Sequence, residues 1–302
     1  MKSTAKRVLR SFIRRLPWGA RESIFDELCL RMGEGEAFRR LAARMKITGI
    51  SANGDYGLIQ SAWNDLAILP SYAQTGRWAA RTVEFFEEFF TADGGTYIDI
   101  GANIGLTTIP IARNHNVSCW AFEPEPVNFN NLANNVLLNC SLKNVTISQI
   151  ALMDKPGEIS LGIADDGNLG DHRVSTGLSG RRVVHVTAST LDELNLPLIG
   201  PVGIKIDTQG AEPFVLGGGQ KTLAAAGAVV VEFSPAHMAE VGGDVQTVID
   251  YLCSFAHVAI ATEGTTSPLA WTEGAELRGY LSKFYVQNRG RIDQYVDVFA
   301  RR

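Results

Sequence analysis

The stretch Thr96-Tyr-Ile-Asp-Ile-Gly-Ala-Asn-Ile-Gly105 decides the fold that this sequence predicts. Its apolar first half predicts a short buried strand that ends at Asp99–Ile100. Its second half predicts a glycine turn and a helix that begins near Asn103. The two glycines, four residues apart, would let a ligand approach the backbone at the helix N-terminus. On its own, the stretch is equally consistent with an ordinary glycine turn between a strand and a helix.

The spacing and the acid of this stretch indicate the kind of ligand. Gly-x-x-x-Gly differs from the Gly-x-Gly-x-x-Gly of dinucleotide-binding turns, so no pyrophosphate cradle is predicted. Asp99 stands two residues before Gly101, at the carboxyl end of the predicted strand. A carboxylate there suits a ligand that carries an ammonium group and an amino-acid backbone. S-adenosylmethionine is such a ligand.

The following segments predict a parallel sheet. Val117–Phe122 is an apolar strand, Val127–Leu138 has the pattern of a helix, and Val145–Leu152 has the pattern of a third strand that closes at Ala151-Leu152. Strands that alternate with helices in this way form parallel sheets with right-handed crossovers.

The second strand is followed by Glu123 and Pro124. An acid about twenty residues after a glycine turn can accept hydrogen bonds from both hydroxyls of a ribose. Ligands of parallel sheets bind beyond the carboxyl ends of the strands, where Asp99, Glu123 and Ala151 all fall. All three residues are therefore expected at the same edge of the sheet, where a ligand would bind.

Composition bounds the class of protein. The chain has 302 residues and a hydrophobic fraction of 45%, which is typical of a globular protein with ample core. Its four cysteines (Cys29, Cys119, Cys140 and Cys253) are scattered without a C-x-x-C motif. This favours a reduced, cytoplasmic setting and no zinc site. No apolar run is long enough to span a membrane, and the charged first residues do not resemble a signal peptide.

Charge is spread unevenly along the chain. Residues 1–50 contain twelve Lys/Arg and five Asp/Glu, a net charge of +7, so residues 51–302 carry −11 of the total of −4. The acidic body argues against a nucleic-acid substrate, because phosphate contacts need lysine and arginine.

The basic residues near the start form an amphipathic pattern. Between residues 2 and 16 they alternate with apolar residues at helical spacing, and Pro17 ends the pattern. Such a helix either packs on its own domain or contacts a partner or the inner face of an anionic membrane peripherally. Residues 20–46 also have a helical pattern. The segment Ile47–Ile59 predicts a hairpin around residues 52–55, and Trp78–Phe90 predicts an amphipathic helix. We therefore divide the chain into an accessory, mainly helical region at residues 1–75, which would form a cap or contact a membrane or a partner, and a catalytic domain at residues 76–302.

The segment after Leu152 departs from the alternation. Glu158–Ala164 and Val183–Val186 predict strands, and Thr190–Leu194 predicts a short helix. Between the two strands, Asp165–Arg182 is polar and rich in glycine, which is typical of a substrate-facing insertion or a loop. Its histidine His172 and the nearby His185 fit surface or structural roles better than substrate contact.

The second chemical stretch is Val202-Gly-Ile-Lys-Ile-Asp-Thr-Gln-Gly-Ala-Glu212, which predicts the fourth parallel strand. Lys205 is a charge in a strand that should be buried, so it needs an acid within reach. Alternation places Lys205 and Asp207 on the same side of the sheet. If this strand lies between the Asp99 strand and the following one, Glu232 is the other candidate partner.

The remaining pattern completes a seven-stranded sheet. Ala228–Phe233 is the fifth strand, with Glu232 near its end and His237 in the loop beyond. Val245–Phe255 predicts a helix, His257–Thr262 a strand, and Lys283–Gln287 a last, antiparallel strand. The fold class expected is α/β: a Rossmann-like class I methyltransferase fold, with a mostly parallel sheet and helices on both faces.

Taken together, these motifs resemble the FkbM family of methyltransferases. The resemblance covers roughly residues 95–235 and rests on four motifs in the right order: Tyr97–Gly105, Ala121–Pro124, Ala151-Leu152 and Lys205–Glu212. It implies an enzyme that uses S-adenosylmethionine and usually methylates hydroxyls on sugars of glycans or on natural products. The family pattern often has valine and glutamate where this chain has Thr208 and Gln209, so residue 209 receives no acid's role.

The resemblance also implies which residues bind the cofactor. The glycine turn and its acid would hold the methionine part, Glu123 and Pro124 the ribose, and Ala151 would lie by the adenine. The turn residues concerned are Asp99, Gly101, Ala102, Asn103 and Gly105.

Methyl transfer to a sugar hydroxyl needs alignment, a water-poor pocket and a base, since the hydroxyl is a poor nucleophile. The candidates for the base are Asp207, Glu232 and His237, with no order among them. Asp207 and Glu232 could instead bind a divalent metal, an arrangement that resembles catechol-type methyltransferases; we do not favour it, because all-oxygen sites usually need a third ligand.

Two other function classes fit parts of the sequence. A nicotinamide-dependent oxidoreductase would share the fold and Glu123, but the chain lacks the glycine fingerprint and a suitably placed Tyr-x-x-x-Lys pair. A non-catalytic scaffold would be expected to lack the cofactor acids, whereas Asp99 and Glu123 are both present. The acceptor, the position methylated and the oligomeric state are not encoded in any motif.

Overall fold

The computed structural model describes residues 47–91, 93–140, 143–164, 167–174, 177, 181–262 and 268–302. The helices predicted within residues 2–16 and 20–46 lie outside the described residues. The chain divides into two compact units, Met1–Ile50 and Ser51–Arg302, and the second contains the whole central sheet. The domain boundary predicted near residue 75 stays a prediction.

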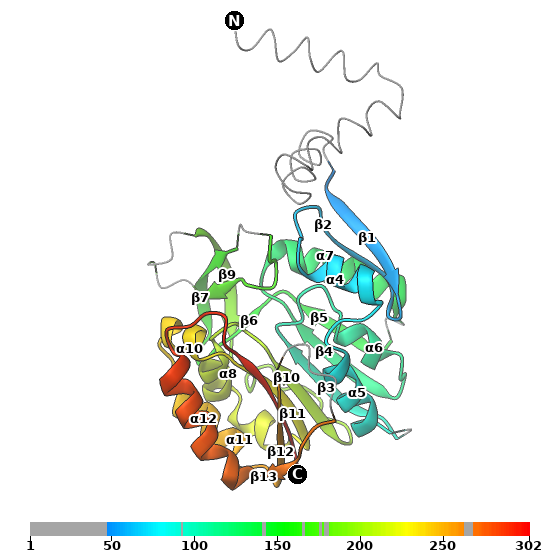
Figure 1. The fold of residues 1–302 in the computed structure, drawn as a ribbon. Helices are drawn as coiled ribbons and strands as arrows, with labels where there is room; N and C mark the ends of the chain where they lie inside the picture. The colour runs from blue at the N-terminus through cyan, green and yellow to red at the C-terminus, as the bar shows by residue number, and fades with distance from the viewer. Residues whose placement is uncertain are drawn as a thin grey trace, which may run out of the picture. The chain divides into compact units, whose positions relative to one another are not determined.

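The central sheet has eight strands in the order β13-β12-β14-β11-β10-β3-β4-β5 (Figure 1). The strands β11, β10, β3, β4 and β5 are parallel neighbours, and β14 runs antiparallel to β11 and β12. This confirms the predicted mostly parallel Rossmann-like sheet with a late antiparallel strand. The sheet has eight strands instead of the seven expected, because the short strand β13 adds a second antiparallel member beside β12. The bounds are β3 Gly95–Ile100, β4 Val117–Phe122, β5 Val145–Ser148, β10 Val202–Ile206, β11 Ala228–Phe233, β12 His257–Ala261, β13 Thr272–Glu273 and β14 Val296–Arg301.

Helices cover both faces of this sheet (Figure 1). In sequence, α5 precedes β3, α6 lies between β3 and β4, and α7 follows β4. The helices α8 to α12 belong to the second half of the chain. The bounds are α5 Ala80–Phe89, α6 Thr108–Ala112, α7 Pro126–Asn139, α8 Glu212–Gly218, α9 Gln220–Ala224, α10 Pro235–Val241, α11 Val245–Leu252 and α12 Gly274–Asn288.

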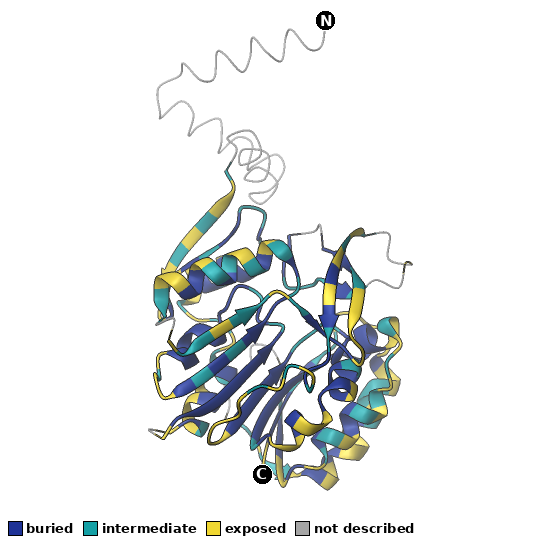
Figure 2. Cartoon of the chain, turned by 180° about the vertical axis from the view of Figure 1, so that it is seen from behind, coloured by how far each residue is buried: buried dark blue, intermediate teal, exposed yellow. Residues whose placement is uncertain are grey.

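The alternation of side chains along β3 explains this two-sided packing. Tyr97 lies 4.9 Å, ring to ring, from Phe86 of α5. Its neighbour Ile98 points the opposite way, into a core cluster with Ile204, Val215 of α8 and Leu252 of α11. Figure 2 shows the resulting pattern, in which the central strands are buried and the outer helices are exposed on one side. Strands buried on both faces are typical of parallel sheets.

A smaller second sheet is inserted after the third strand. It consists of β6 Ala151–Leu152, β7 Gly157–Ile163, β8 Arg173–Val174 and β9 Arg182–Ser189, in the order β6-β9-β7-β8. The single strand predicted over Val145–Leu152 is therefore wrong. Its first half is β5 of the central sheet, and its second half leaves that sheet to pair with β9, because Ala151 lies opposite Ala188.

A hairpin of β1 Gly49–Gly54 and β2 Gly57–Ala62 precedes helix α4, Ile68–Thr75. The hairpin was expected from the sequence, although its turn lies at residues 55–56. Side chains of α7 pair with the backbone of β2 as a neighbouring strand would. Asn135 Oδ1 accepts from Gln60 N at 2.7 Å while its Nδ2 donates to Gln60 O at 2.9 Å, and Asn139 binds Leu58 in the same way.

Three other local predictions are wrong. The helix expected from Asn103 begins at Thr108, because Asn103 has a left-handed backbone (φ 52°). Thr190–Leu194 contains a turn and no helix. The strand expected at Lys283–Gln287 lies inside α12, where Tyr280 stacks on Phe284 one turn later; the last strand is β14. Across the ranges that the structure describes, no helix is long and apolar enough to cross a membrane.

Candidate functional site

The glycine turn after β3 is held between the two neighbouring strands. The amides of Gly101 and Ala102 donate to Phe122 O, each at 3.0 Å, and Asp207 N donates to Ile100 O at 3.0 Å. A Cβ on Gly101, whose φ is 79°, would lie 1.8 Å from the carbonyl oxygen of Asp207. The first glycine is therefore required by the close approach of the end of β10, a reason that the motif alone did not reveal.

Asp99 lies entirely inside the protein at the end of β3. Its Oδ2 accepts hydrogen bonds of 2.6 Å from the hydroxyls of Thr107 and Thr108, and its Oδ1 lies 3.3 Å from Lys205 Nζ. The predicted need of Lys205 for an acid is thus met first by Asp99, with Asp207 Oδ2 at 3.5 Å. Burial lowers the pKa of Lys205, but Asp99 and Asp207 outweigh it and hold this pKa above its ordinary value. Sequence reasoning missed the threonines, whose only signal is their position after Gly105.

Glu123 lies beside the turn with its side chain buried. Its Oε2 accepts from Asn103 N and its Oε1 from Glu125 N, both at 2.9 Å. Burial raises the pKa of Glu123 to about 7, although the two backbone donors lower it. The bond from Asn103 joins the second strand's acid directly to the glycine turn, so two of the predicted cofactor motifs meet. Pro124 follows at the same edge, and Ala151 packs in a cluster with Ala211, next to the start of α8.

The inserted segment reaches over to the glycine turn. The carbonyl oxygen of Leu169 accepts from Asn103 Nδ2 at 3.2 Å and from Asn128 Nδ2 at 2.9 Å. The carbonyl oxygen of Gly167 accepts from Leu66 N at 2.8 Å. Residues 167–170 therefore lie against the turn, and the substrate-facing role predicted for this segment stays a prediction. Sequence reasoning did not single out Asn128.

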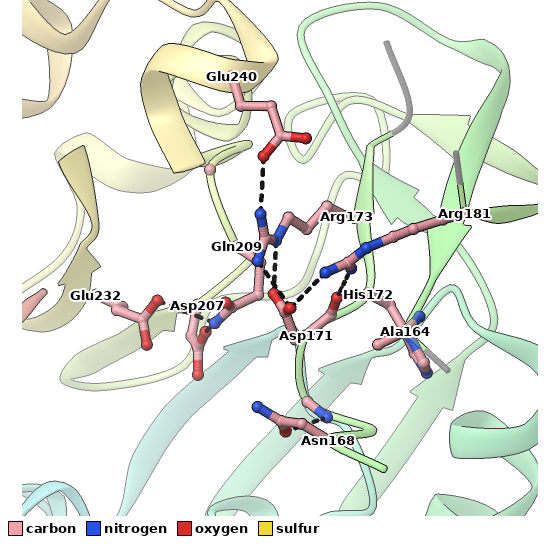
Figure 3. A network of polar contacts seen from close by, with 12 residues as sticks. Ala164, Asn168, Asp171, His172, Arg173, Arg181, Asp207, Gln209, Glu232 and Glu240 are labelled. Atoms are coloured by element: carbon pink, nitrogen blue, oxygen red, sulfur yellow. Dashed lines mark hydrogen bonds and ion pairs between the residues drawn. The ribbon is translucent and has the colours of Figure 1, made fainter. Parts of the chain in front are cut away.

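Asp207 and Glu232 come together at the carboxyl ends of β10 and β11, and Gln209 joins them (Figure 3). The amide nitrogen of Gln209 donates to Asp207 Oδ1 at 2.8 Å and to Glu232 Oε1 at 2.9 Å. The Asp207 side chain is 34% exposed. Glu232 is partly buried, and burial, followed by the nearby Asp207 and Asp297 carboxylates, raises its pKa well above the ordinary value.

His237, the third candidate base, lies on α10 and is buried. Its Cβ would be 3.0 Å from a Cβ added to Gly210, so it borders the loop that carries Asp207 and Gln209. Within the described part of the chain, neither ring nitrogen has a hydrogen-bond partner. Burial, and then the charge of Arg173, lowers the pKa of His237 to about 4. The imidazole is therefore neutral near pH 7.

An ionic network joins the inserted sheet to α10 (Figure 3). Arg173 donates to Asp171 Oδ1 at 2.5 Å and Oδ2 at 2.7 Å, and to Glu240 Oε2 at 2.8 Å. Arg181 donates to Asp171 Oδ2 at 2.6 Å and to the Asp171 carbonyl oxygen. Burial raises the pKa of Asp171, but the two arginines outweigh it and lower this pKa below its ordinary value. Asp171, Arg173 and Glu240 also act electrostatically on His237, so the network lies near the candidate bases.

The two other histidines considered have different environments. His172 Nδ1 accepts from Ala164 N at 3.0 Å, a bond within the inserted segment. His185 lies on β9 with an exposed side chain near Glu158.

Comparison with known proteins gives one family match for this chain. Residues 99–258, more than half of the chain, match the family model described as Methyltransferase FkbM domain. A search of curated proteins finds no match.

Solved structures show a distant likeness. Precorrin-6y C5,15-methyltransferase from Geobacter metallireducens is 14% identical, with 74% of this chain and 87% of that chain covered and a TM-score of 0.37. TYW2 from M. jannaschii in complex with AdoMet is 14% identical, with 84% and 87% covered and a TM-score of 0.38. A putative O-methyltransferase from Klebsiella pneumoniae is 12% identical, with 74% and 80% covered and a TM-score of 0.39.

Proposed function

Because the chain belongs to the FkbM methyltransferase domain family, we propose that it transfers a methyl group from S-adenosylmethionine to a hydroxyl of a sugar, a glycan or a natural product. One observation carries the proposal beyond the family. A partly exposed carboxylate, Asp207, lies at the end of β10 immediately beside the glycine turn, so a base and the cofactor turn share one edge of the sheet.

The donor set of the turn fits S-adenosylmethionine. Each carboxylate oxygen of Glu123 accepts one backbone N–H, which leaves acceptor capacity on both oxygens for the two hydroxyls of a ribose. The cofactor would supply an electrophilic methyl group on a positively charged sulfur. The turn residues Gly101, Ala102, Asn103 and Gly105 would hold its methionine part. The buried charge of Asp99 would act on it together with that of Lys205.

Asp207 is the favoured base among the three candidates. Its side chain is 34% exposed, so an acceptor hydroxyl can reach it and pass its proton to an Asp207 oxygen. Glu232 keeps its proton to a higher pH than an ordinary glutamate does, because its pKa is raised, so it is less suited to accept one. His237 is neutral, and both of its ring nitrogens are buried without a hydrogen-bond partner in the described residues, so an acceptor hydroxyl reaches them less readily than it reaches Asp207. A positioned base contributes about 10²–10⁴ in rate.

A polyhydroxylated acceptor agrees with the polar groups around the bases. Arg173, Arg181, Asp171 and Gln209 provide hydrogen-bonding groups near Asp207 and His237, and the body of the chain is acidic, which disfavours nucleic acid. A cytoplasmic location, and contact of residues 2–16 with a partner or the inner membrane face, belong to the same proposal.

The test is a calorimetric titration with S-adenosylhomocysteine and, separately, with NADH. We expect S-adenosylhomocysteine alone to bind, and Glu123→Gln to weaken it, since a glutamine can no longer accept at both positions. Glu123 is a better control than Asp99, because Asp99→Ala would leave Lys205 without its main partner. Binding of NADH in place of S-adenosylhomocysteine would support an oxidoreductase. Binding of neither would support a non-catalytic scaffold.

The acceptor can then be sought with radiolabelled S-adenosylmethionine and fractionated glycans and natural products. We expect label on a hydroxyl, and Asp207→Asn to reduce the rate by about 10²–10⁴ while S-adenosylhomocysteine still binds. Label on a nitrogen or a carbon would contradict O-methylation.

A further inference from the structure

Gln209 occupies an unusual place between two acids. Its Nε2 donates to Asp207 Oδ1 at 2.8 Å and to Glu232 Oε1 at 2.9 Å. An amide nitrogen carries two hydrogens, so both are committed to these two carboxyl groups. The acids belong to the ends of neighbouring strands, β10 and β11, and in the described residues Gln209 is the side chain that bonds to both.

Gln209 is held between the two acids by a strained backbone conformation. Its φ is 53°, in the left-handed region that a non-glycine residue enters at roughly 1–3 kcal/mol. The loop is fixed in this shape by the fully buried Glu212, whose carboxylate accepts from Thr208 N at 2.8 Å, from Thr208 Oγ1 at 3.0 Å and from Gly210 N at 2.9 Å. Strain of this kind is typical of functional sites, where surrounding contacts over-determine the conformation.

The charges around Gln209 explain why a donor is needed. Asp207, Asp297 of β14 and Glu212 of α8 all act on Glu232 as like charges, and Lys205 of β10 is the opposing cation. Lys205 lies 3.5 Å from Asp207 Oδ2, on the oxygen that Gln209 does not bind. Two carboxyl groups at adjacent strand ends are hard oxygen ligands of the kind that bind divalent cations. Here the amide hydrogens point at both of them instead.

We propose that Gln209 is a positioning residue that takes the place of a divalent cation between Asp207 and Glu232 and fixes the Asp207 carboxylate, without a metal ion, for proton transfer from the acceptor. The bridging part of this inference stands on the contacts alone. The proton-transfer part rests on the proposed function. Together, Gln209 and Lys205 hold both oxygens of Asp207, so its carboxylate plane is set from two sides.

The bridging part is tested by titrating full-length wild type, Gln209→Glu and Gln209→Met with Mn²⁺, followed by calorimetry and electron paramagnetic resonance. Gln209→Glu places a third carboxylate beside Asp207 and Glu232, so we expect it to bind one Mn²⁺ at least about tenfold more tightly than wild type. Adding Asp207→Asn to Gln209→Glu should abolish this binding. Equal Mn²⁺ affinity in wild type and Gln209→Glu would overturn the proposal, as would a folded Gln209→Glu protein that binds none.

A second measurement separates positioning from mere packing. The side-chain carboxyl carbon of Glu232 is followed by NMR as pH changes, with Glu232→Gln used to assign it. Gln209→Met keeps the bulk of the side chain and removes the amide, so the Glu232 titration midpoint should rise by about one pH unit. Thr208→Ser, the matched control in the same loop, should leave it unchanged. An unchanged midpoint in Gln209→Met would overturn the proposal.

The same proteins are titrated with S-adenosylhomocysteine. We expect Gln209→Met to bind it as wild type does, because Gln209 makes no contact with the glycine turn among the bonds described. Failure of wild type to bind would overturn the proposed function while leaving the Mn²⁺ and NMR results to decide the role of Gln209.

Discussion

Lys205 and Asp99 are paired across neighbouring parallel strands, with Lys205 Nζ 3.3 Å from Asp99 Oδ1. The two residues stand opposite each other in the register of β10 and β3. The same ammonium donates to Gly101 O at 2.9 Å and lies 3.5 Å from Asp207 Oδ2. One buried cation therefore ties together the strand ends and the glycine turn on which the candidate site is built.

Replacing this cation should destabilise the protein strongly. Lys205→Met leaves Asp99 charged and buried, and breaking a buried pair in this way costs about 3–5 kcal/mol. Urea unfolding measures the loss. As a control, Arg77→Met removes exposed ion pairs with Asp55 and Glu84 and should cost much less stability than Lys205→Met. The double variant Asp99→Asn/Lys205→Met should recover part of the loss; a Lys205→Met loss no larger than that of Arg77→Met would contradict the ion pair's role.

Much of the fold could be predicted from the sequence because the deciding signals are local. The strands β3, β4, β10 and β11 are short apolar runs, and α7 follows a proline with a helical pattern, so each is identifiable from its own residues. The pairing of Lys205 with an acid could also be predicted, since a charge in a central strand needs a partner. Which acid lies closest to Lys205 depends on the order of the strands. Asp99 is the closest because it stands opposite Lys205 in the register of β3 and β10.

The failures depend on contacts between distant segments. Lys283–Gln287 has strand-like residues, but Tyr280 and Phe284 stack along one helix face and Leu281 is buried in the core, so tertiary packing overrides local propensity. The end of β5 at Ser148 has no local signal in the sequence, because it depends on the pairing of Ala151 with β9, more than thirty residues later. The bridge made by Gln209 was missed for the same reason: it joins the ends of two strands.

Gly101→Ala should be severely destabilising. The added Cβ would lie 1.8 Å from the Asp207 carbonyl oxygen, at a φ of 79°, so the end of β10 must move. We expect a loss of several kcal/mol in urea unfolding, or no folded protein. The matched control is Gly279→Ala in α12, where an added Cβ meets nothing within 4 Å; it should stabilise the protein by about 0.5–1 kcal/mol. Equal stability of the two variants would contradict the close approach.

Glu123 should make the folded protein less stable as pH rises. Its folded pKa of about 7 lies above its ordinary value of 4.5, so between these values the folded state holds a proton that the unfolded state has lost. Stability therefore falls by about 3 kcal/mol from about pH 4.5 to pH 7 on account of this group. Glu123→Gln should flatten that part of the slope in unfolding experiments at several pH values. Parallel curves for Glu123→Gln and wild type would contradict the raised pKa.

His237 should act in the opposite direction. Its pKa in the folded state, about 4, lies below the ordinary value of 6.5. Between these two pH values the unfolded state therefore binds a proton that the folded state does not bind. Stability therefore falls as pH drops from about 6.5 toward 4. NMR of the ring protons should show His237 neutral throughout pH 5.5–8, and His237→Gln should remove part of the acid destabilisation. A titration of the His237 ring near pH 6.5 would show instead that its site is open to water or to a carboxylate.

The ionic network should control how firmly the inserted sheet is held on α10. Arg173 is buried and bonds to both Asp171 and Glu240, while Glu240 is exposed. Glu240→Gln should therefore cost little global stability, at most about 1 kcal/mol, but free one end of the network. In hydrogen exchange, the amides of β8 and residues 171–174 should exchange up to about tenfold faster, and the amides of β3 should keep their wild-type rates. The control Asp250→Asn breaks an exposed pair with Arg278 far along the chain and should leave both regions unchanged. Faster exchange in β3 as well as in β8 would mean that Glu240 supports the whole domain rather than this one attachment.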